Sequence, residues 1–158
     1  MPKTAWTLSN SACLALLFAC SCALTIPAQS KELVPYKIAN GAISKSLTGT
    51  EGDPANGRKV VIDSKRGGCL SCHKIPIPEE QFHGEVGPDL ADVASRLSEG
   101  QMRLRLVDAK HVNPETFMPA FYKVAGLHRV QKKYEGKTIL TAQEVEDVIA
   151  YLKTLKTP

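Results

Sequence analysis

Cys69-Leu70-Ser71-Cys72-His73 is the stretch of sequence that decides the fold. Two cysteines three residues apart, followed directly by a histidine, form the pentapeptide to which c-type haem is attached. Each thiol adds to one vinyl group on the same edge of the porphyrin, and the adjacent imidazole becomes the proximal ligand of the iron. The sequence therefore predicts one covalent haem c held by Cys69 and Cys72, with His73 as an axial ligand of the iron.

Two other kinds of site use a Cys-x-x-Cys pair and compete with this interpretation. A structural zinc site needs four ligands, usually with a second clustered pair, but His83, His111 and His128 are scattered along the chain. A thioredoxin-like dithiol opens a helix in a βαβ unit, and no strand pattern surrounds residues 60–90. Haem attachment is therefore the interpretation that the residues favour. A metal-structured binding module without haem remains as an alternative of a different class.

The first 30 residues have the composition of a secretory signal. They contain one charged residue, Lys3, and an apolar run over residues 12–24. The run is shorter than the roughly 20 apolar residues that span a bilayer, so we expect a cleaved signal peptide over residues 1–30 and a periplasmic protein. Leu17-Phe18-Ala19-Cys20 also resembles a lipoprotein cleavage box, which would leave a lipidated Cys20 at a membrane. Without that lipid we expect no membrane association.

Removal of the signal simplifies the cysteine count. Of the five cysteines, Cys13, Cys20 and Cys22 lie in the signal, so that Cys69 and Cys72 remain and neither is free for a disulfide. A mature chain of about 128 residues suits one domain, and a buried haem would add to the apolar core of so small a domain. The remaining 19 basic and 16 acidic side chains give a formal charge of +3. This mild charge gives no sign of nucleic-acid binding.

The rest of the mature chain predicts an all-α domain over residues 53–158, preceded by an extended N-terminal arm over residues 31–52. Asp53-Pro54 is a helix start, with an N-cap followed by proline at the first helical position. We expect this helix to reach about Lys65, where Arg66-Gly67-Gly68 ends it. A short helix is expected over residues 90–96. No hairpin or set of parallel strands is indicated, so the helices are joined by long loops.

Two capping boxes mark two further helices. Ser98 to Gln101 opens a helix that should run to about Ala109, and Thr141 to Glu144 opens the last one. After the second box, one apolar stripe faces a charged face; its members are Val145, Val148, Ile149, Leu152 and Leu155.

These elements in this order resemble a class I cytochrome c, in which the first and last helices cross beside the haem. Gly57 in the first helix would allow a close crossing opposite Tyr151 and Leu152. The sequence equally allows that Gly57 is a tolerated helix glycine.

Met118 is the candidate for the second axial ligand. It lies 46 residues after Cys72, in the proline-rich stretch Asn113-Pro114-Glu115-Thr116-Phe117-Met118-Pro119, and a loop methionine between two helices can reach the far face of a haem. Met102 lies inside an expected helix and suits packing instead. His111 is the main competitor, ahead of His83, His128 and a lysine. A neutral thioether ligand would raise the reduction potential relative to two imidazoles.

Gly87-Pro88-Asp89-Leu90 resembles the Gly-Pro-x-Leu segment of class I cytochromes. In that segment the proline carbonyl accepts a hydrogen bond from the proximal imidazole, which fixes the ring. The resemblance implies this role for Pro88. The alternative is a simple turn before a helix.

The whole mature chain resembles the SoxX family, the monohaem cytochrome subunits of the SoxAX complex in bacterial thiosulfate oxidation. The matching stretches are residues 46–54, 68–73, 87–90, 113–122 and 140–152. The haem motif and the last helix are generic for class I cytochromes. The Asn-Pro-x-Thr-x-Met-Pro segment and the following Gly126-Leu127-His128-Arg129-Val130 are specific.

The resemblance implies a partnership in an L-cysteine S-thiosulfotransferase of sulfur oxidation. In that family the SoxA subunit carries the catalytic haem, and the complex joins thiosulfate to a cysteine of the SoxYZ carrier. This chain would accept the electrons released and pass them to a downstream soluble cytochrome c, without a catalytic residue of its own. The alternative is a freestanding soluble cytochrome c that serves a respiratory chain. The long loops, which a minimal carrier does not need, favour the subunit.

A basic stretch follows Met118 closely in sequence. It would dock an acidic partner near the haem edge or form a solvated loop; its members are Lys123, His128, Arg129, Lys132, Lys133 and Lys137.

Overall fold

The computed structural model describes residue 1 and residues 33–157. The expected signal peptide, the lipoprotein-like box and Cys20 lie outside the described residues. In the described part, the chain is helical and has no strand longer than an isolated bridge between Ala39 and Ala42. The predicted all-α class is therefore confirmed for these residues. Within them, no helix has both the length and the apolar character needed to cross a bilayer.

The first helix, α1, spans Pro54–Ile62. Asp53 caps it by accepting a hydrogen bond from the Ala55 N–H at 2.8 Å, and Pro54 occupies the first helical position, as the sequence predicts. The helix ends before the expected Lys65, because Asp63 leaves helical geometry and starts a turn. The N–H groups of Arg66 and Gly68 both donate to the Asp63 carbonyl at 3.0 Å. This turn leads the chain into the attachment segment.

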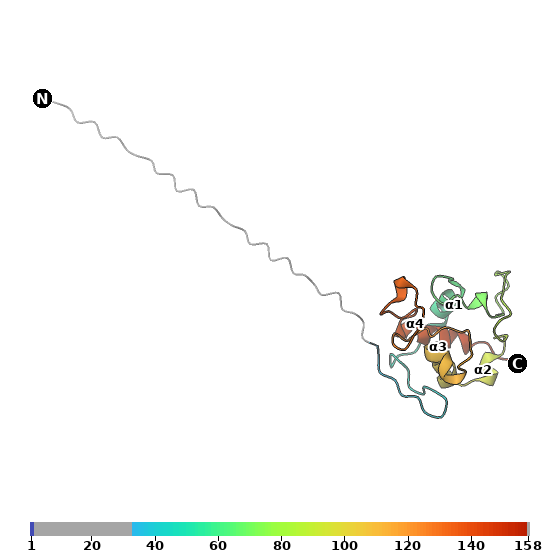
Figure 1. Ribbon diagram of the computed structural model, residues 1–158. Helices are drawn as coiled ribbons and strands as arrows, with labels where there is room; N and C mark the ends of the chain where they lie inside the picture. The colour runs from blue at the N-terminus through green and yellow to red at the C-terminus, as the bar shows by residue number, and fades with distance from the viewer. Residues whose placement is uncertain (2–32, 158) are drawn as a thin grey trace. The chain divides into compact units, whose positions relative to one another are not determined.

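The last helix, α4, spans Ala142–Leu152 and crosses α1 closely (Figure 1). At the crossing, Gly57 lies against the backbone of Asp147 and Val148, and a Cβ at position 57 would collide with the Asp147 carbonyl oxygen. Gly57 is therefore a packing glycine. The contact lies at Asp147, about one helical turn before the expected Tyr151 and Leu152.

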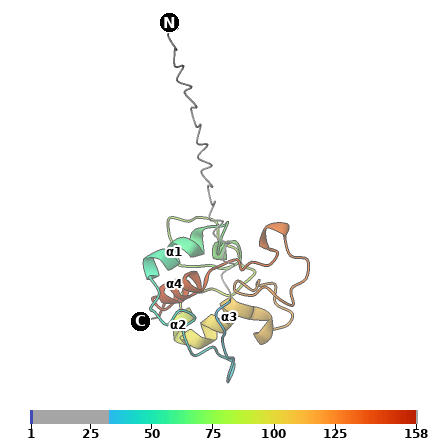
Figure 2. The ribbon, with the colours of Figure 1, turned by 90° about the vertical axis from the view of Figure 1, so that its left-hand side faces the viewer.

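The long helix α3 spans Glu99–Val112 and packs on α4. Figure 2 shows α4 between α1 and α3. Both predicted capping boxes are present: Ser98 with Gln101 opens α3, and Thr141 with Glu144 opens α4. The helix is kinked at Asp108, whose backbone is extended, and it continues to Val112, three residues past the expected Ala109.

The short helix α2 spans Val93–Arg96, which is the second half of the helix expected over residues 90–96. The first half does not form because Leu90 donates its N–H to the Lys74 carbonyl at 2.9 Å. Ala91 donates its N–H to the side chain of Asp89. Two 3₁₀ turns, η1 over Cys69–Ser71 and η2 over Lys132–Tyr134, complete the described helical elements.

The face of α4 that the sequence predicts to be charged is partly buried. The predicted apolar stripe is buried as expected, but Glu146 and Asp147 are also only 4% and 3% exposed. Glu146 is paired with the equally buried Arg103 of α3. Asp147 accepts hydrogen bonds from the Asp53 N–H and the Asn56 side chain at the start of α1. These carboxylates therefore join helices instead of facing water.

Residues 33–52 contain no helix, but they pack on the helical body. Ile43 and Leu47 are buried, at 1% and 3% exposed. The Ile43 N–H donates to the Gly100 carbonyl, and the Leu47 N–H donates to the Glu146 carboxylate at 2.8 Å. This segment therefore closes the core on the side where α3 meets α4.

Candidate functional site

A cavity of about 650 Å³ lies between the attachment segment, α2, α3, α4 and the loop after α3. This volume is within the range of ligand pockets in proteins. Met102, Leu106 and Ala109 of α3 and Val148 and Leu152 of α4 form apolar parts of its wall. The helices thus supply an apolar cavity, and the loops supply its donor atoms.

Cys69, Cys72 and His73 line this cavity together. The turn η1 brings them there: the N–H groups of Cys72 and His73 donate to the Cys69 carbonyl at 3.1 and 2.9 Å. The chain therefore folds over itself within one turn, so that two thiols and an imidazole reach the same space. This is the arrangement that attachment of haem at Cys-x-x-Cys-His requires.

The ring of His73 is held by a bond to the backbone. Its Nδ1 lies 2.7 Å from the carbonyl oxygen of Pro88, to which it donates. This bond fixes the tautomer, so that Nε2 carries a free lone pair for a metal. The turn predicted as the alternative for Pro88 is also present, since the chain bends before α2.

Gly87 also belongs to the site, because the absence of a side chain leaves room for the His73 ring. The sequence does not indicate this role. A Cβ at position 87 would collide with the imidazole of His73. The Gly87 N–H also donates to the Cys72 carbonyl at 2.7 Å. The Gly-Pro pair was the signal from which this contact could have been found, because a glycine beside a ligand-holding carbonyl often allows close backbone approach.

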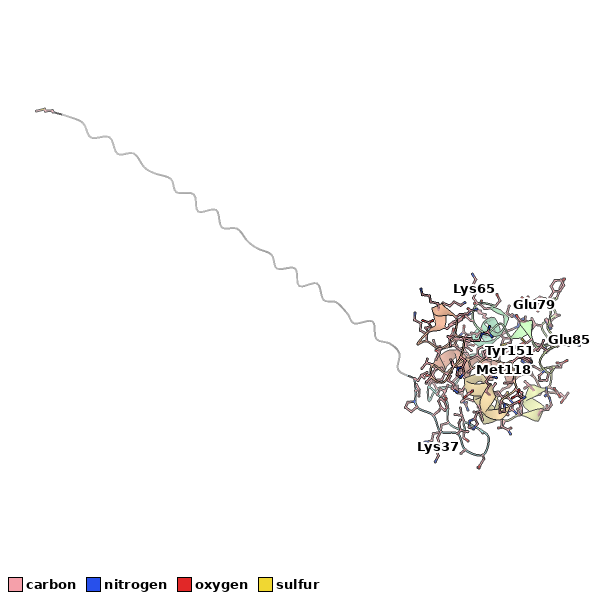
Figure 3. All side chains as sticks on the ribbon, in the orientation of Figure 1. Lys37, Lys65, Glu79, Glu85, Met118 and Tyr151 are labelled. Atoms are coloured by element: carbon pink, nitrogen blue, oxygen red, sulfur yellow. The ribbon has the colours of Figure 1, made fainter. Side chains whose placement is uncertain are left out.

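Met118 reaches the same cavity from the loop after α3. Figure 3 places Met118 over the middle of the domain, whereas Lys37 and Glu85 project from its edge. The loop is tied to α3 at its end, where the Phe121 N–H donates to the Leu106 carbonyl at 2.9 Å. The structure thus brings together Met118 and the attachment segment, which are far apart in sequence.

Lys110 fixes the loop from its outer side. Its Nζ donates to the carbonyls of Pro114 and Thr116, both at 2.9 Å. The Met118 N–H donates to the Thr116 hydroxyl at 3.2 Å. These bonds restrict the backbone that presents the methionine.

The competing ligands are placed differently. Met102 is 3% exposed and lines the cavity from α3, as expected for a packing residue. His111 is exposed at the end of α3, and His111, His83 and His128 are absent from the cavity wall. His83 Nδ1 accepts the Ile75 N–H at 3.3 Å, and its buried Nε2 has no partner among the described residues.

The thiol of Cys69 is protonated at neutral pH in the folded chain. Burial raises its pKa to about 11, whereas Cys72 is exposed. A neutral thiol is a poor nucleophile.

The donor set and the walls of the cavity fit a haem c. The two thiols would provide the covalent links, the imidazole and the thioether would provide two neutral ligands, and the apolar wall suits a porphyrin. Within the described residues, no three His, Cys, Asp or Glu side chains are grouped to hold a metal ion by themselves. The assignment of Cys69, Cys72, His73, Pro88 and Met118 to the haem stays a prediction on which the proposal below builds.

Three other charged residues line the cavity: Arg96, Arg105 and Glu115. Arg96 is paired with Asp92 at 2.8 Å. Glu115 is exposed in the methionine loop. Arg105 is half-buried on α3.

The basic stretch is partly committed to contacts within the domain. Lys123 pairs with Asp108 at 2.6 Å, and the Lys133 ammonium lies 4.5 Å from the centre of the Tyr134 ring. Tyr134 in turn donates to the Lys65 carbonyl at 3.2 Å. Both interpretations of this stretch, a docking surface and a solvated loop, stay predictions.

Comparisons with known proteins agree with this geometry. A model of the family described as cytochrome c matches residues 54–156. A chain of the crystal structure of SoxXA from P. pantotrophus is 38% identical in sequence, with a TM-score of 0.71. The match covers 77% of this chain and 95% of that chain. No sequence among the curated proteins matches the chain.

Proposed function

The chain belongs to the class I cytochrome c family as a SoxX-type member, and on this premise we propose that it is the electron-accepting subunit of a SoxAX-like complex. Membership implies covalent haem c and electron transfer. Beyond family membership, we propose that the chain binds one haem. The electrons that it accepts would come from the oxidative coupling of thiosulfate to a cysteine of a SoxYZ-type carrier.

The observation that carries the proposal is the convergence of His73 and Met118 on one cavity that also contains Cys69 and Cys72. When bound, haem c supplies a one-electron Fe(III)/Fe(II) couple. His73 Nε2 and the Met118 sulfur, which both reach the cavity, would hold its iron. Because both are neutral and one is a thioether, they would favour the reduced state and raise the reduction potential.

The remaining residues keep this donor set in place. The Pro88 carbonyl orients the His73 ring, and Lys110 and Thr116 restrain the backbone around Met118. The apolar side chains of α3 and α4 exclude water from the inner wall. With two protein ligands for the iron, binding of small external ligands is disfavoured, which suits electron transfer better than peroxide chemistry.

The coupling reaction explains why a carrier of single electrons is useful. A thiol and thiosulfate form a sulfur–sulfur bond with loss of one proton and two electrons, so this chain must accept one electron, pass it on, and accept the second. No described side chain at the cavity supplies the nucleophile, because both thiols are assigned to the haem. The reacting sulfur atoms would therefore lie on the SoxYZ-type carrier, and the SoxA-type partner would hold the catalytic site.

Expression with a haem-attachment pathway tests the haem, and co-purification tests the complex. The secreted polypeptide should carry the mass of one haem and show a c-type spectrum. A bare chain mass from cells competent in cytochrome maturation would refute the proposal. Stable elution with a second cytochrome is expected, whereas elution alone would favour the freestanding electron carrier.

Met118→Ala tests the second ligand in the oxidised protein. A sulfur-to-iron charge-transfer band is expected in the wild type and should be lost in the variant, together with a lowered midpoint potential. Persistence of the band would transfer the role to another sulfur. A wild type without the band would direct attention to His111, with His111→Ala as the next variant.

We also propose a periplasmic location, with residues 1–30 removed and with residues 33–52 packed against the helices as part of the cytochrome domain. The composition of residues 1–30 supports this, and covalent attachment of c-type haem takes place outside the bacterial cytoplasm. The mass of the mature N-terminal peptide from periplasmic and membrane fractions tests it. A peptide that starts at a lipidated Cys20 would place the protein at the membrane.

A further inference from the structure

The cavity-facing side of α3 carries a single charge. Met102, Arg105, Leu106 and Ala109 recur at helical spacing and all line the cavity. Arg105 is therefore the one cation in an otherwise apolar stripe. A charge in such a place costs free energy unless it is paired.

The structure leaves most of the hydrogen-bonding capacity of Arg105 unused. Of the five N–H donors of its guanidinium, one donates from Nη1 to the Gln101 carbonyl at 3.0 Å. Among the described residues, no carboxylate forms an ion pair with Arg105. Arg103, two positions earlier, instead binds both oxygens of Glu146. The contrast between the two arginines indicates that Arg105 is available to bind a group outside the polypeptide.

An arginine fork binds planar carboxylates in particular, through two parallel hydrogen bonds. The haem assigned to this cavity carries two propionate carboxylates, which need a cation or water. We propose that Arg105 binds a haem propionate and so raises the reduction potential of the site. This inference rests on the proposed function, since it requires the haem.

The other charged groups that face the cavity do not take this role. Arg96 of α2 is already held by Asp92, and it also donates to the Asp89 carbonyl. Glu115 of the methionine loop is an anion and would repel a propionate. His73 of the attachment segment is assigned to the iron, and the cavity-lining residues of α4, Val148 and Leu152, carry no charge. Arg105 is the remaining cation.

The proposed contact should change the midpoint potential in a direction that can be measured. A positive charge near the iron disfavours Fe(III), so its removal lowers the midpoint potential. The same charge holds the propionate ionised to lower pH, since a carboxylate beside an arginine typically has a pKa about one to three units below its usual range. Removal of Arg105 therefore moves the pH-dependent part of the potential curve to higher pH.

The experiment is a spectroelectrochemical titration of purified holoprotein from about pH 5 to about pH 9, a span that covers carboxylates with raised pKa values. Arg105→Met removes the charge and keeps an apolar side chain that suits the stripe, and Arg105→Lys retains the charge without the fork. Arg129→Met is the matched control, because it removes the same charge from an exposed position that does not line the cavity. Arg105→Gln replaces the methionine variant if that variant does not accumulate.

Arg105→Met should lower the potential at neutral pH and move its pH-dependent segment upward by about one to three pH units. Arg105→Lys should restore most of the potential, and Arg129→Met should match the wild type. A curve for Arg105→Met that superimposes on that of Arg129→Met overturns the inference. Absence of covalent haem in the wild type would refute the proposed function instead, so the two failures are distinguishable.

Discussion

The guanidinium of Arg103 on α3 holds both carboxylate oxygens of Glu146 on α4, with its Nε and Nη2 donors each at 2.8 Å. The two side chains are 3% and 5% exposed. Arg103 also donates to the Ile43 carbonyl at 2.7 Å, and Glu146 accepts the Leu47 N–H at 2.8 Å. One buried ion pair therefore joins two helices to the N-terminal segment.

Arg103→Met should lower the free energy of unfolding by about 3–5 kcal/mol, because it leaves the Glu146 carboxylate buried without its counter-charge. Urea denaturation of the holoprotein measures this change. Arg58→Met is the matched control, since it breaks an exposed ion pair with Glu79 and should lower the free energy of unfolding far less. Equal effects of the two variants would contradict a structural role for the buried pair.

Gly57→Ala should destabilise the protein although alanine favours helices. In an exposed helix interior the change would stabilise by about 1 kcal/mol. Here the new Cβ would collide with the Asp147 carbonyl oxygen, so α1 and α4 must separate. A lowered midpoint in thermal unfolding is expected, and a raised one would show that the two helices do not cross in contact at this residue.

Gly87→Ala should disturb the iron site without removing a ligand. The added Cβ would collide with the His73 imidazole, so the ring must turn away from the Pro88 carbonyl. We expect an altered visible spectrum and a shifted midpoint potential with the haem still attached. Gly136→Ala strains the backbone at a positive φ of 66° outside the cavity wall, and it therefore controls for destabilisation away from the site. Identical spectra for Gly87→Ala and the wild type would contradict the contact.

Lys110→Met should loosen the loop that carries Met118. The lysine ammonium donates to two loop carbonyls, and the loss of such bonds at an exposed site costs about 1 kcal/mol. The affinity of the oxidised protein for added imidazole should rise roughly fivefold, as that energy implies. Lys137→Met removes an exposed lysine from outside the cavity wall and should leave imidazole binding unchanged. No difference between the two variants would exclude Lys110 from positioning the methionine.

Asp147→Asn should change how stability depends on pH. Burial acts to raise the pKa of Asp147, but hydrogen bonds from Asn56, Gln143 and the Asp53 N–H outweigh it and hold that pKa below its ordinary value. A depressed folded-state pKa gives stability that is complete above the unfolded pKa of about 4 and is lost as the pH falls through the folded one.

The asparagine variant should therefore be less stable than the wild type at neutral pH, and the difference should shrink below about pH 4. Urea denaturation at neutral and acidic pH measures both. Some acid sensitivity remains in the variant, because the pKa of Glu144 also lies below its ordinary value. Burial alone would raise that pKa, but hydrogen bonds from Thr141 and Arg66 outweigh the effect of burial. A stability difference that is constant with pH would contradict the role of the Asp147 charge.

The helix starts could be predicted because they depend on local chemistry. Asp53, Ser98 and Thr141 each accept a hydrogen bond from a backbone N–H two or three residues later, which any reader of the sequence can anticipate. The helix ends were less predictable. The Leu90 N–H leaves helical pairing for the Lys74 carbonyl, a contact that only the folded chain creates.

The same difference separates the haem-attachment residues from the buried ion pair between the helices. Cys69, Cys72 and His73 are adjacent in sequence, and their spacing alone predicts their chemistry. The burial of Arg103 could not be predicted, because an arginine four positions from Glu99 is typical of a solvated helix face. Glu99 lies 4.0 Å from the guanidinium, but the closer partner at 2.8 Å is Glu146 on another helix, and no local pattern indicates such a pair.

The crossing of α1 and α4 joins segments from opposite ends of the domain. A polypeptide made from its N-terminus presents Cys69 and Cys72 long before residues 142–152 exist. Until α1 and α4 have crossed, the Cys69 thiol is not yet buried and keeps the reactivity of an ordinary thiol. Formation of the crossing therefore ends the period in which this thiol is reactive.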